Sequence, residues 1–566
     1  MAKLVIYQVM TRLFGSDAGV NVPNGDKAVN GCGTMSDFDG RALAEIRRLG
    51  ATHIWYTGII EHATQTDYSA YGIQRDHRAI VKGKAGSAYA IKDYYDVDPD
   101  IATSVPARMR EFENLVRRSH RAGLKVIIDF VPNHVARQYH SDSCPAGVED
   151  LGAKDDSSKH FSAENNFYYF PEQGFHTDFD LQQGEAEPYS EWPARATGND
   201  VFSSFAGHND WYETVKLNYG VDYTSGRQTH FDPVPSTWQK MTDILLFWAA
   251  KGVDGFRCDM AEMVPAEFWG WAIPRVKAKY PEIIFIAEIY GPDAYRTYLT
   301  LGHFDYLYDK VGLYDTLRAV TCGYANANSI TNCWQSVDDI RPSMLSFLEN
   351  HDEQRLASEF FAGAPERGRA PMIVASTIST GPVMIYFGQE LGERGMDTEG
   401  YSGRDGRTTI FDYWTVDTIS RWRNKGRFDN YHLTAEELEI QSFYSRILNL
   451  CSNEKAIAEG DFYDLMYVNQ QSAGFNQHRH YAYLRRAGKE ILLIVANFDN
   501  QEADVEINIP AHVFELYSLK PTLRTKAVDL LTDKSSFISF SPEHPTHLHL
   551  PALSGCIMKF RAASHS

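Results

Sequence analysis

The sequence predicts an α/β fold in which a (β/α)8 TIM barrel carries a subdomain inserted after its third strand and an antiparallel β-sandwich at its C-terminal end. Short β-branched or aromatic runs alternate with amphipathic stretches, eight such runs can be counted, and strands become closely spaced beyond about residue 454. Alternating strands and helices favour a parallel sheet, and eight units in 566 residues favour closure into a barrel.

The first three predicted strands lie before residue 135. They are LVIYQV from Leu4, THIWYTG around Ile54 and LKVIIDFV from Leu124. A helix over residues 35–50 is indicated by apolar side chains on one helical face, namely Phe38, Leu43, Ile46 and Leu49. A second helix is predicted over residues 105–122.

The alternation stops between residues 136 and 235. This segment is rich in Asn, Asp, Gly, Ser and aromatic residues and shows no sustained period. Because an unstructured loop of this length is uncommon inside a compact domain, the segment is predicted to be an inserted subdomain.

Five more predicted strands follow, separated by helices. One helix covers residues 237–252 and ends at Gly252, and another covers 264–280 and is interrupted by Pro274. The strands are VDGFRCD from Val253, IIFIAEIY from Ile283, FDYLYD near Asp305, MLSFLEN near Leu345 and PVMIYFG near Met384. An open doubly wound sheet is the alternative, but no glycine-rich dinucleotide-binding motif follows the first strand.

The C-terminal part has a different pattern. The runs ILLIVANF, DVEINI, FISFS, HLHLPALSG and CIMKFRA alternate or are strand-like and are joined by turns. The predicted domains are therefore a barrel over residues 1–135 and 236–453, an inserted subdomain over 136–235, and a β-sandwich over 454–566.

The composition restricts the class of partner. The net charge of −19, from 55 basic and 74 acidic side chains, argues against nucleic acid or an anionic membrane as a partner, because phosphate would be repelled. A neutral substrate is compatible with this charge, although acidity that serves only solubility explains it equally well. The composition does not predict the oligomeric state.

Cysteine usage and the N-terminus favour the cytoplasm. The seven cysteines are an odd number and lie far apart in the sequence, which favours a reducing compartment. No CxxC pair indicates a zinc ribbon or a thioredoxin-like site. No run approaches the roughly 20 apolar residues of a membrane span, and no signal-peptide cleavage site follows the first apolar stretch. A trimmed secreted or periplasmic form is the alternative.

Polar clusters occur where four predicted strands end. The segments are Asp129–His134, Gly255–Asp259, Glu288–Tyr290 and Glu349–Asp352. In a parallel barrel these ends meet at one mouth, where active sites lie. Each cluster alone has a structural explanation as a turn, a surface ion pair or a helix cap, but their common placement predicts an active site.

Two carboxylates in opposite roles are what glycosidic cleavage requires. Arg257 projects from the same strand face as Asp259, and its positive charge favours an ionised nucleophile. Glu288 follows a run of apolar residues, a setting that suits a carboxyl that must hold a proton. A spacing of roughly 5–5.5 Å between the two carboxyls would indicate retention of configuration, and a wider one inversion.

The motifs DFVPNH, GFRCD, AEIYG and ENHD, in this order, resemble the four signatures of the α-amylase family, glycoside hydrolase family 13. The resemblance extends across nearly the whole chain. AYAIKDYY from Ala88 is similar to the family's aromatic substrate-binding segment, and YFGQE from Tyr386 to the end of its eighth strand. The family's inserted subdomain and C-terminal sandwich correspond to the two remaining parts of this chain.

The resemblance implies roles for seven residues. Asp259 is the nucleophile, Glu288 the acid/base, and Asp352 the third carboxylate, which holds sugar hydroxyls. The substrate-binding residues are Tyr89, which stacks on the sugar, His134 and His351, which hydrogen-bond it, and Arg257. The implied activity is retaining hydrolysis of α-glucosidic bonds, α-1,4 bonds above all, in starch-type glucans or maltooligosaccharides.

Three alternatives stay open within this resemblance and one outside it. The chain could be an α-glucan transglycosylase or isomerase, a neopullulanase-like hydrolase of α-1,4 and α-1,6 bonds, or a catalytically silent carbohydrate-binding homologue. A metal-dependent hydrolase built on Asp129, His134 and His351 is the alternative from another class.

The resemblance requires no cofactor for the chemistry, and a structural calcium ion is its open question. Asn133 matches a calcium-ligand position, and the segment with Asn24, Asp26 and Asn30 resembles a calcium loop of neopullulanase-like members, with a plain turn as the alternative. Glu262 and Met263 stand where amylases often have a lysine and a histidine, which puts acceptor recognition and the family's calcium site in question.

Overall fold

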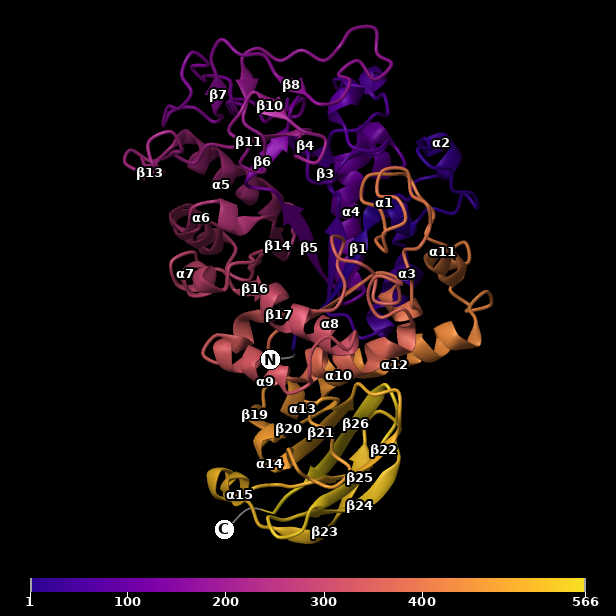
Figure 1. Ribbon diagram of the computed structural model, residues 1–566. Coiled ribbons are helices and arrows are strands. Elements are labelled where there is room, and N and C mark those ends of the chain that lie inside the picture. Colours follow the sequence, from indigo (N-terminus) through magenta and orange to yellow (C-terminus); the bar gives the residue numbers. More distant parts are fainter. Residues whose placement is uncertain (1–2, 564–566) are drawn as a thin grey trace.

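The computed structural model describes residues 3–563, and its central unit is a closed barrel of eight parallel strands (Figure 1). The strands follow one another around the barrel in chain order, and the last pairs with the first. This confirms the predicted fold class. The strands are β1 Val5–Met10, β2 His53–Thr57, β5 Lys125–Phe130, β14 Gly255–Cys258, β15 Ile284–Ala287, β16 Tyr306–Tyr308, β17 Met344–Phe347 and β18 Val383–Tyr386.

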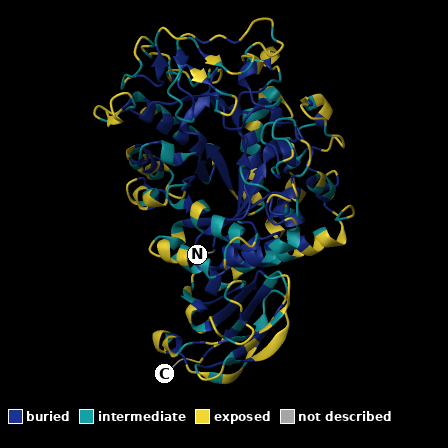
Figure 2. Cartoon of the chain, viewed as in Figure 1, coloured by how far each residue is buried: buried dark blue, intermediate teal, exposed yellow. Residues whose placement is uncertain are grey.

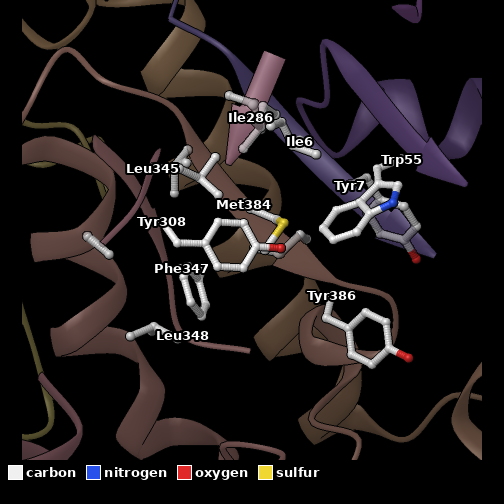
Figure 3. Close-up of a cluster of buried hydrophobic side chains, with 14 of the residues drawn as sticks. Ile6, Tyr7, Trp55, Ile286, Tyr308, Leu345, Phe347, Leu348, Met384 and Tyr386 are labelled. Atoms are coloured by element: carbon white, nitrogen blue, oxygen red, sulfur yellow. The ribbon is translucent and has the colours of Figure 1, made fainter. Parts of the chain in front are cut away.

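The barrel strands are buried on both faces (Figure 2), as expected where helices cover the outside and side chains fill the inside. In the interior, Ile6, Ile286 and Leu345 come from different strands and pack together, with Trp55 and Tyr308 beside them (Figure 3). The barrel is therefore a packed core that holds the strand ends in fixed positions.

Helices surround the barrel. In α3, Asp39 caps the N-terminus by accepting hydrogen bonds from the amides of Arg41 and Ala42, and the predicted apolar face is buried. Pro274 lies inside α6 and does not end it. The helices of the barrel region with at least six residues are α3 Gly40–Arg48, α4 Arg108–Arg121, α5 Ser236–Ala249, α6 Ala266–Lys279, α7 Tyr295–Thr300, α8 Asp315–Thr321, α9 Ser329–Ser336, α10 Arg369–Thr377, α11 Asp417–Arg423 and α12 Ala435–Asn453.

The segment after β5 forms a separate layer at one end of the barrel (Figure 1). It has its own apolar cluster, which includes Tyr168, Phe175 and Tyr212. Its pairing begins at His134, two residues before the expected boundary, because β6 pairs antiparallel with β11. Its strands are β6 His134–Ala136, β7 Tyr169–Phe170, β8 His176–Thr177, β9 Ala194–Arg195, β10 Phe205–Ala206, β11 Thr214–Lys216, β12 Val221–Asp222 and β13 Gln228–Thr229.

A second segment outside the barrel sheet follows β2. The strands β3 Ile60–His62 and β4 Ile91–Val97 pair antiparallel outside the barrel sheet. The loop between them carries Lys82 and Tyr89 to the barrel mouth.

The C-terminal domain lies beyond α10 and α12, away from the inserted segment (Figure 1). It has a six-stranded antiparallel sheet in the order β19-β20-β21-β26-β23-β24 and a two-stranded sheet of β22 and β25. The strands are β19 Asp461–Asp464, β20 His480–Ala487, β21 Glu490–Asn497, β22 Ala503–Ile507, β23 Thr522–Asp529, β24 Ser535–Phe540, β25 Thr546–Leu550 and β26 Ser554–Arg561, and the helix α15 covers Ala511–Tyr517. Across residues 3–563, no helix combines the length and the apolar character that a membrane crossing needs.

Candidate active site

The guanidinium of Arg257 joins three of the carboxylates at the barrel mouth. Its Nη1 atom lies 2.8 Å from Oδ1 of Asp259 and 3.2 Å from Oδ1 of Asp129, and its Nη2 atom lies 2.7 Å from Oε2 of Glu288. Arg257 has no exposed side-chain surface, and Tyr308 accepts a hydrogen bond from its Nε at 3.1 Å. Arg257 therefore lies behind the carboxylates and orients them, and it does not contact the cavity itself.

Asp259 and Glu288 occupy neighbouring positions on paired strands. Arg257 pairs with Ile286 and Cys258 with Ala287 in the parallel register of β14 and β15. Asp259 and Glu288 directly follow these two strands, and neighbouring strands are roughly 4.8 Å apart. The register thus brings the two carboxyls to the same level of the barrel mouth.

Glu288 is held by two further donors. The amide of Met260 donates to Oε2 and the hydroxyl of Tyr290 donates to Oε1, each at 2.7 Å. Met260 has a φ of 42°, a left-handed conformation that non-glycine residues rarely adopt, and this conformation places its amide beside Glu288. The acid/base candidate is therefore fixed at both oxygens.

Glu262 supports this arrangement from the side. Its carboxylate accepts hydrogen bonds from the amides of Tyr290 at 3.0 Å and Gly291 at 2.9 Å. At the position where amylases often carry a sugar-binding lysine, this chain has a carboxylate that fixes the loop after Glu288.

His351 lies between Tyr89 and Asp352. Its ring stacks on Tyr89 with centroids 4.9 Å apart and planes at 18°. The side-chain amide of Gln8 donates to Nδ1 at 2.8 Å, so Nε2 carries the proton and faces Oδ2 of Asp352 at 3.1 Å. This tautomer places a donor beside Asp352 at the cavity wall.

His134 begins β6 and lies beside the ring of Trp211, with centroids 5.2 Å apart. Burial, together with the charge of Lys216, lowers the pKa of His134 to about 3. His134 is therefore neutral at physiological pH and can both donate and accept a hydrogen bond from a neutral ligand.

The carboxylates outnumber the cation that holds them. Burial raises the pKa of Asp259 well above its ordinary value; Arg257 opposes this, whereas Glu288 and Asp129 add to it. Burial raises the pKa of Asp129 to about 6. Burial thus raises the pKa of Asp259 more than the charge of Arg257 lowers it. The cluster of carboxyls therefore favours retention of a shared proton.

A cavity of about 360 Å³ opens at these strand ends. Six of the seven predicted catalytic and substrate-binding residues line it, and Arg257 lies behind them. These six are Tyr89, His134, Asp259, Glu288, His351 and Asp352. The other lining residues are Lys82, Ser87, Trp211, Glu213, Thr214, Met260, Tyr290, Ile410 and Phe411.

Some of these additional lining residues carried a signal in the sequence. Trp211 is an aromatic in the inserted segment, and Tyr290 lies within the AEIYG motif. No sequence pattern indicated Lys82, Glu213 or Phe411, because each of them reaches the cavity only through tertiary contacts.

The oxygen of Asn133 that a calcium ion would need is bound to an ammonium group. Lys216 donates from Nζ to Oδ1 of Asn133 at 2.6 Å, and the same Nζ lies 2.6 Å from Oδ1 of Asp200. The Lys216 side chain is only 2% exposed. A buried positive charge of the chain itself therefore fills this position, and the residues do not fit a calcium ion there.

The predicted loop ligands serve the local backbone. Asp26 caps the short helix α2 Lys27–Asn30 by accepting from the amide of Val29, and Asn24 adopts a left-handed φ of 57°. The Asn30 side chain bonds both backbone groups of Val22 and the carbonyl of Tyr413. These contacts are those of a turn, and within residues 3–563 no group of three or more His, Cys, Asp or Glu side chains could hold a metal ion.

Comparison with known proteins agrees with this geometry. The family model described as "Alpha amylase, catalytic domain" matches residues 30–527. "Alpha-amylase 3" of Dictyoglomus thermophilum is 22% identical over 392 residues, which are 66% of this chain and 68% of that protein. The α-1,4-glucan:maltose-1-phosphate maltosyltransferase of Cereibacter sphaeroides is 25% identical over 294 residues, 46% of this chain and 47% of that protein.

Among solved structures, the maltogenic α-amylase AmyB of Thermotoga neapolitana is similar in fold. The TM-score is 0.62 at 19% identity, over 99% of this chain and 98% of that one. At this identity the likeness shows a shared fold.

Proposed function

Since the chain belongs to the α-amylase family of glycoside hydrolases, we propose that it hydrolyses α-1,4-glucosidic bonds in starch-type glucans or maltooligosaccharides with retention of configuration. One observation supports retention above all, namely the register that places Asp259 and Glu288 side by side at the ends of paired strands. A spacing near that of neighbouring strands suits direct attack by a carboxylate, whereas inversion needs room for a water molecule between the groups.

In the first step, the carboxylate of Asp259 attacks the anomeric carbon. The bond from that carbon to the glycosidic oxygen breaks, and Glu288 gives its proton to the departing oxygen. A covalent glucosyl ester on Asp259 results, and Glu288 is left as a carboxylate that Met260, Tyr290 and Arg257 stabilise.

In the second step, Glu288 takes a proton from a water molecule that attacks the same carbon from the opposite face. The ester bond to Asp259 breaks, and both carboxyls return to their starting states. Two inversions leave the product with the α configuration of the substrate. Among the lining residues, Tyr89 supplies an aromatic surface for the sugar ring, and His134, His351 and Asp352 supply partners for its hydroxyls.

Transfer to a second sugar is the alternative outcome of the same intermediate. The similarity to a protein named as a maltosyltransferase favours considering it. The two reactions differ only in whether water or a sugar hydroxyl captures the ester, so product lengths distinguish them.

We propose that this chemistry needs no cofactor, since both proton transfers and the nucleophile come from side chains. The charge of −19 suits a neutral glucan better than nucleic acid. All seven cysteines are free, which favours a reducing compartment and hence the cytoplasm.

Incubation with maltoheptaose, followed by NMR of the anomeric protons, tests the proposal. We expect shorter maltooligosaccharides that appear first as α-anomers, and none with Asp259→Asn. Early β-anomers would contradict retention, and products longer than the substrate would establish transfer. An inert wild-type enzyme would contradict α-1,4 hydrolysis and direct the next assays to α-1,6-linked glucans.

A further inference from the structure

We propose that the cavity admits only the non-reducing end of a glucan chain, because the Lys82–Glu213 ion pair and the Phe411 loop close it on the side away from the leaving group. This inference rests on the proposed hydrolase activity and specifies its substrate as a free chain end. An enzyme that cuts inside a chain needs a groove open on both sides of the catalytic carboxylates.

The position of Glu288 gives the direction of the bound chain. Glu288 must face the glycosidic oxygen, so the leaving part of the substrate lies on its side of the cavity, beside Met260 and Tyr290. Glu213 directly precedes β11, in which Lys216 pairs with His134 of β6, so Lys82 and Glu213 line the same cavity on the side of His134. The ion pair therefore lies where the chain beyond the cleaved sugar would continue.

The ion pair joins two segments that are far apart in sequence. Nζ of Lys82 lies 3.1 Å from Oε2 of Glu213, and the two side chains are 8% and 6% exposed. The same Nζ donates to the carbonyl of Asp210 at 3.0 Å and lies 5.1 Å from the centre of the Tyr212 ring. Separating a buried pair leaves uncompensated charge, so a passing sugar chain would not displace it.

The loop after β18 completes the closure. The carbonyl of Phe411 accepts a hydrogen bond from Ala85 at 3.0 Å, and it is so close to Gly83 that a Cβ there would lie 2.2 Å from it. The ring of Phe411 lies beside that of Tyr401, with ring centroids 4.6 Å apart. The ring of Tyr401 in turn lies near that of His208 in the inserted segment, with ring centroids 6.2 Å apart. Three segments thus meet around this side of the cavity: the β3–β4 loop, the inserted segment and the β18 loop.

Two consequences follow from a closed end. A cyclic glucan has no end to insert, so it should not be a substrate. A linear glucan enters to a fixed depth, so the first cut should release a product of one length from its non-reducing end.

The test compares maltoheptaose with β-cyclodextrin. Both contain the same number of glucosyl units and the same linkage, but maltoheptaose is linear and has chain ends, whereas β-cyclodextrin is a ring and has none. We expect the wild-type enzyme to cleave maltoheptaose and to cleave β-cyclodextrin at least 100-fold more slowly. Similar rates on both would overturn this inference and leave the proposed hydrolase standing. Failure on both would overturn the proposed function and the inference together.

A double variant tests which residues form the wall. Lys82→Ala with Glu213→Ala removes the pair, and we expect it to gain cleavage of β-cyclodextrin by about tenfold or more relative to maltoheptaose. Lys251→Ala with Glu113→Ala, which removes a more exposed ion pair of 2.9 Å outside the cavity, is the matched control and should not change this ratio. A double variant that still cleaves maltoheptaose but gains nothing on the ring would show that the pair is not the barrier.

Discussion

Nζ of Lys216 lies 2.6 Å from Oδ1 of Asn133, so a side chain from β11 supplies the positive charge at the junction of the barrel and the inserted segment. A covalently attached ammonium cannot dissociate as a metal ion can. The junction should therefore hold without an added cation at any metal concentration.

We expect EDTA to leave both activity and the thermal unfolding midpoint unchanged. Lys216→Met should lower the midpoint by several degrees, since Asp200 and Asn133 lose a buried partner. Lys251→Met, which breaks an ion pair of 2.9 Å with more exposed side chains, is the control and should change the midpoint little. Calorimetry with and without EDTA checks this, and a midpoint that falls with EDTA would contradict it.

Asp259→Asn should abolish turnover without destabilising the fold. The variant lacks the nucleophile, so kcat should fall by about 10⁴-fold or more. Burial and the neighbouring carboxyls raise the pKa of Asp259, which means that its charge is unfavourable in the folded state at neutral pH. Thermal unfolding at pH 7 should show an unchanged or higher midpoint; a clearly lower one would mean that the ion pair with Arg257 outweighs the burial of the charge.

Glu288→Gln should act on substrates according to their leaving groups. On maltoheptaose, loss of the acid should reduce kcat/KM by about 10²–10⁴-fold. On α-glucosyl fluoride, whose leaving group needs no proton, the first step should be much less affected. Steady-state rates on both substrates measure the difference, and an equal loss on both would remove Glu288 from the role of acid.

The barrel was predictable because its strands are buried on both faces and therefore appear as continuous apolar runs. The strand ends then identified Asp259, Glu288 and Asp352 without any knowledge of their contacts. Other elements left no such pattern. The strands β19, β20 and β23 were not predicted. Only Ala527 of β23 is buried, so the sequence of this strand has no apolar alternation.

Contacts between distant residues could not be predicted. Lys216 is 83 residues from Asn133, and nothing in either segment indicates the pairing. Lys82 and Glu213 are charged residues of kinds that usually face solvent, and only the fold brings them together as a buried wall. The pKa of Asp259 was misjudged because the sequence showed the adjacent arginine but not how deeply the carboxyl is buried, and burial is the largest cause of its raised pKa.

Glu262→Ala should make the position of the acid/base Glu288 less fixed, although Glu262 does not line the cavity. The substitution frees the amides of Tyr290 and Gly291, which follow Glu288 in the chain. We expect kcat to fall about tenfold on maltoheptaose, with a smaller loss on α-glucosyl fluoride, because proton donation depends on the position of Glu288. Glu262→Gln keeps one acceptor oxygen and should recover part of the rate; a glutamine variant no better than alanine would contradict this role.

His53 should make the fold sensitive to acid. The side chain is buried at the start of β2, and burial, together with the charge of Lys125, lowers the pKa of His53 to about 4. The unfolded chain has the ordinary value of about 6.5 and therefore binds this proton at a higher pH than the folded chain does. The stabilisation is thus complete above about pH 6.5 and is lost as the pH falls toward 4, by about 1.4 kcal/mol per pH unit.

The thermal unfolding midpoint of the wild type should accordingly fall between about pH 6.5 and 4.5, and it should fall less in His53→Gln, which has no proton to bind. His432→Gln replaces an exposed histidine and should leave the pH dependence unchanged. His134, whose pKa is also lowered by burial, remains in both variants, so part of the acid sensitivity should persist in His53→Gln. Identical pH dependence in the wild type and His53→Gln would show that His53 takes up its proton without unfolding of the barrel.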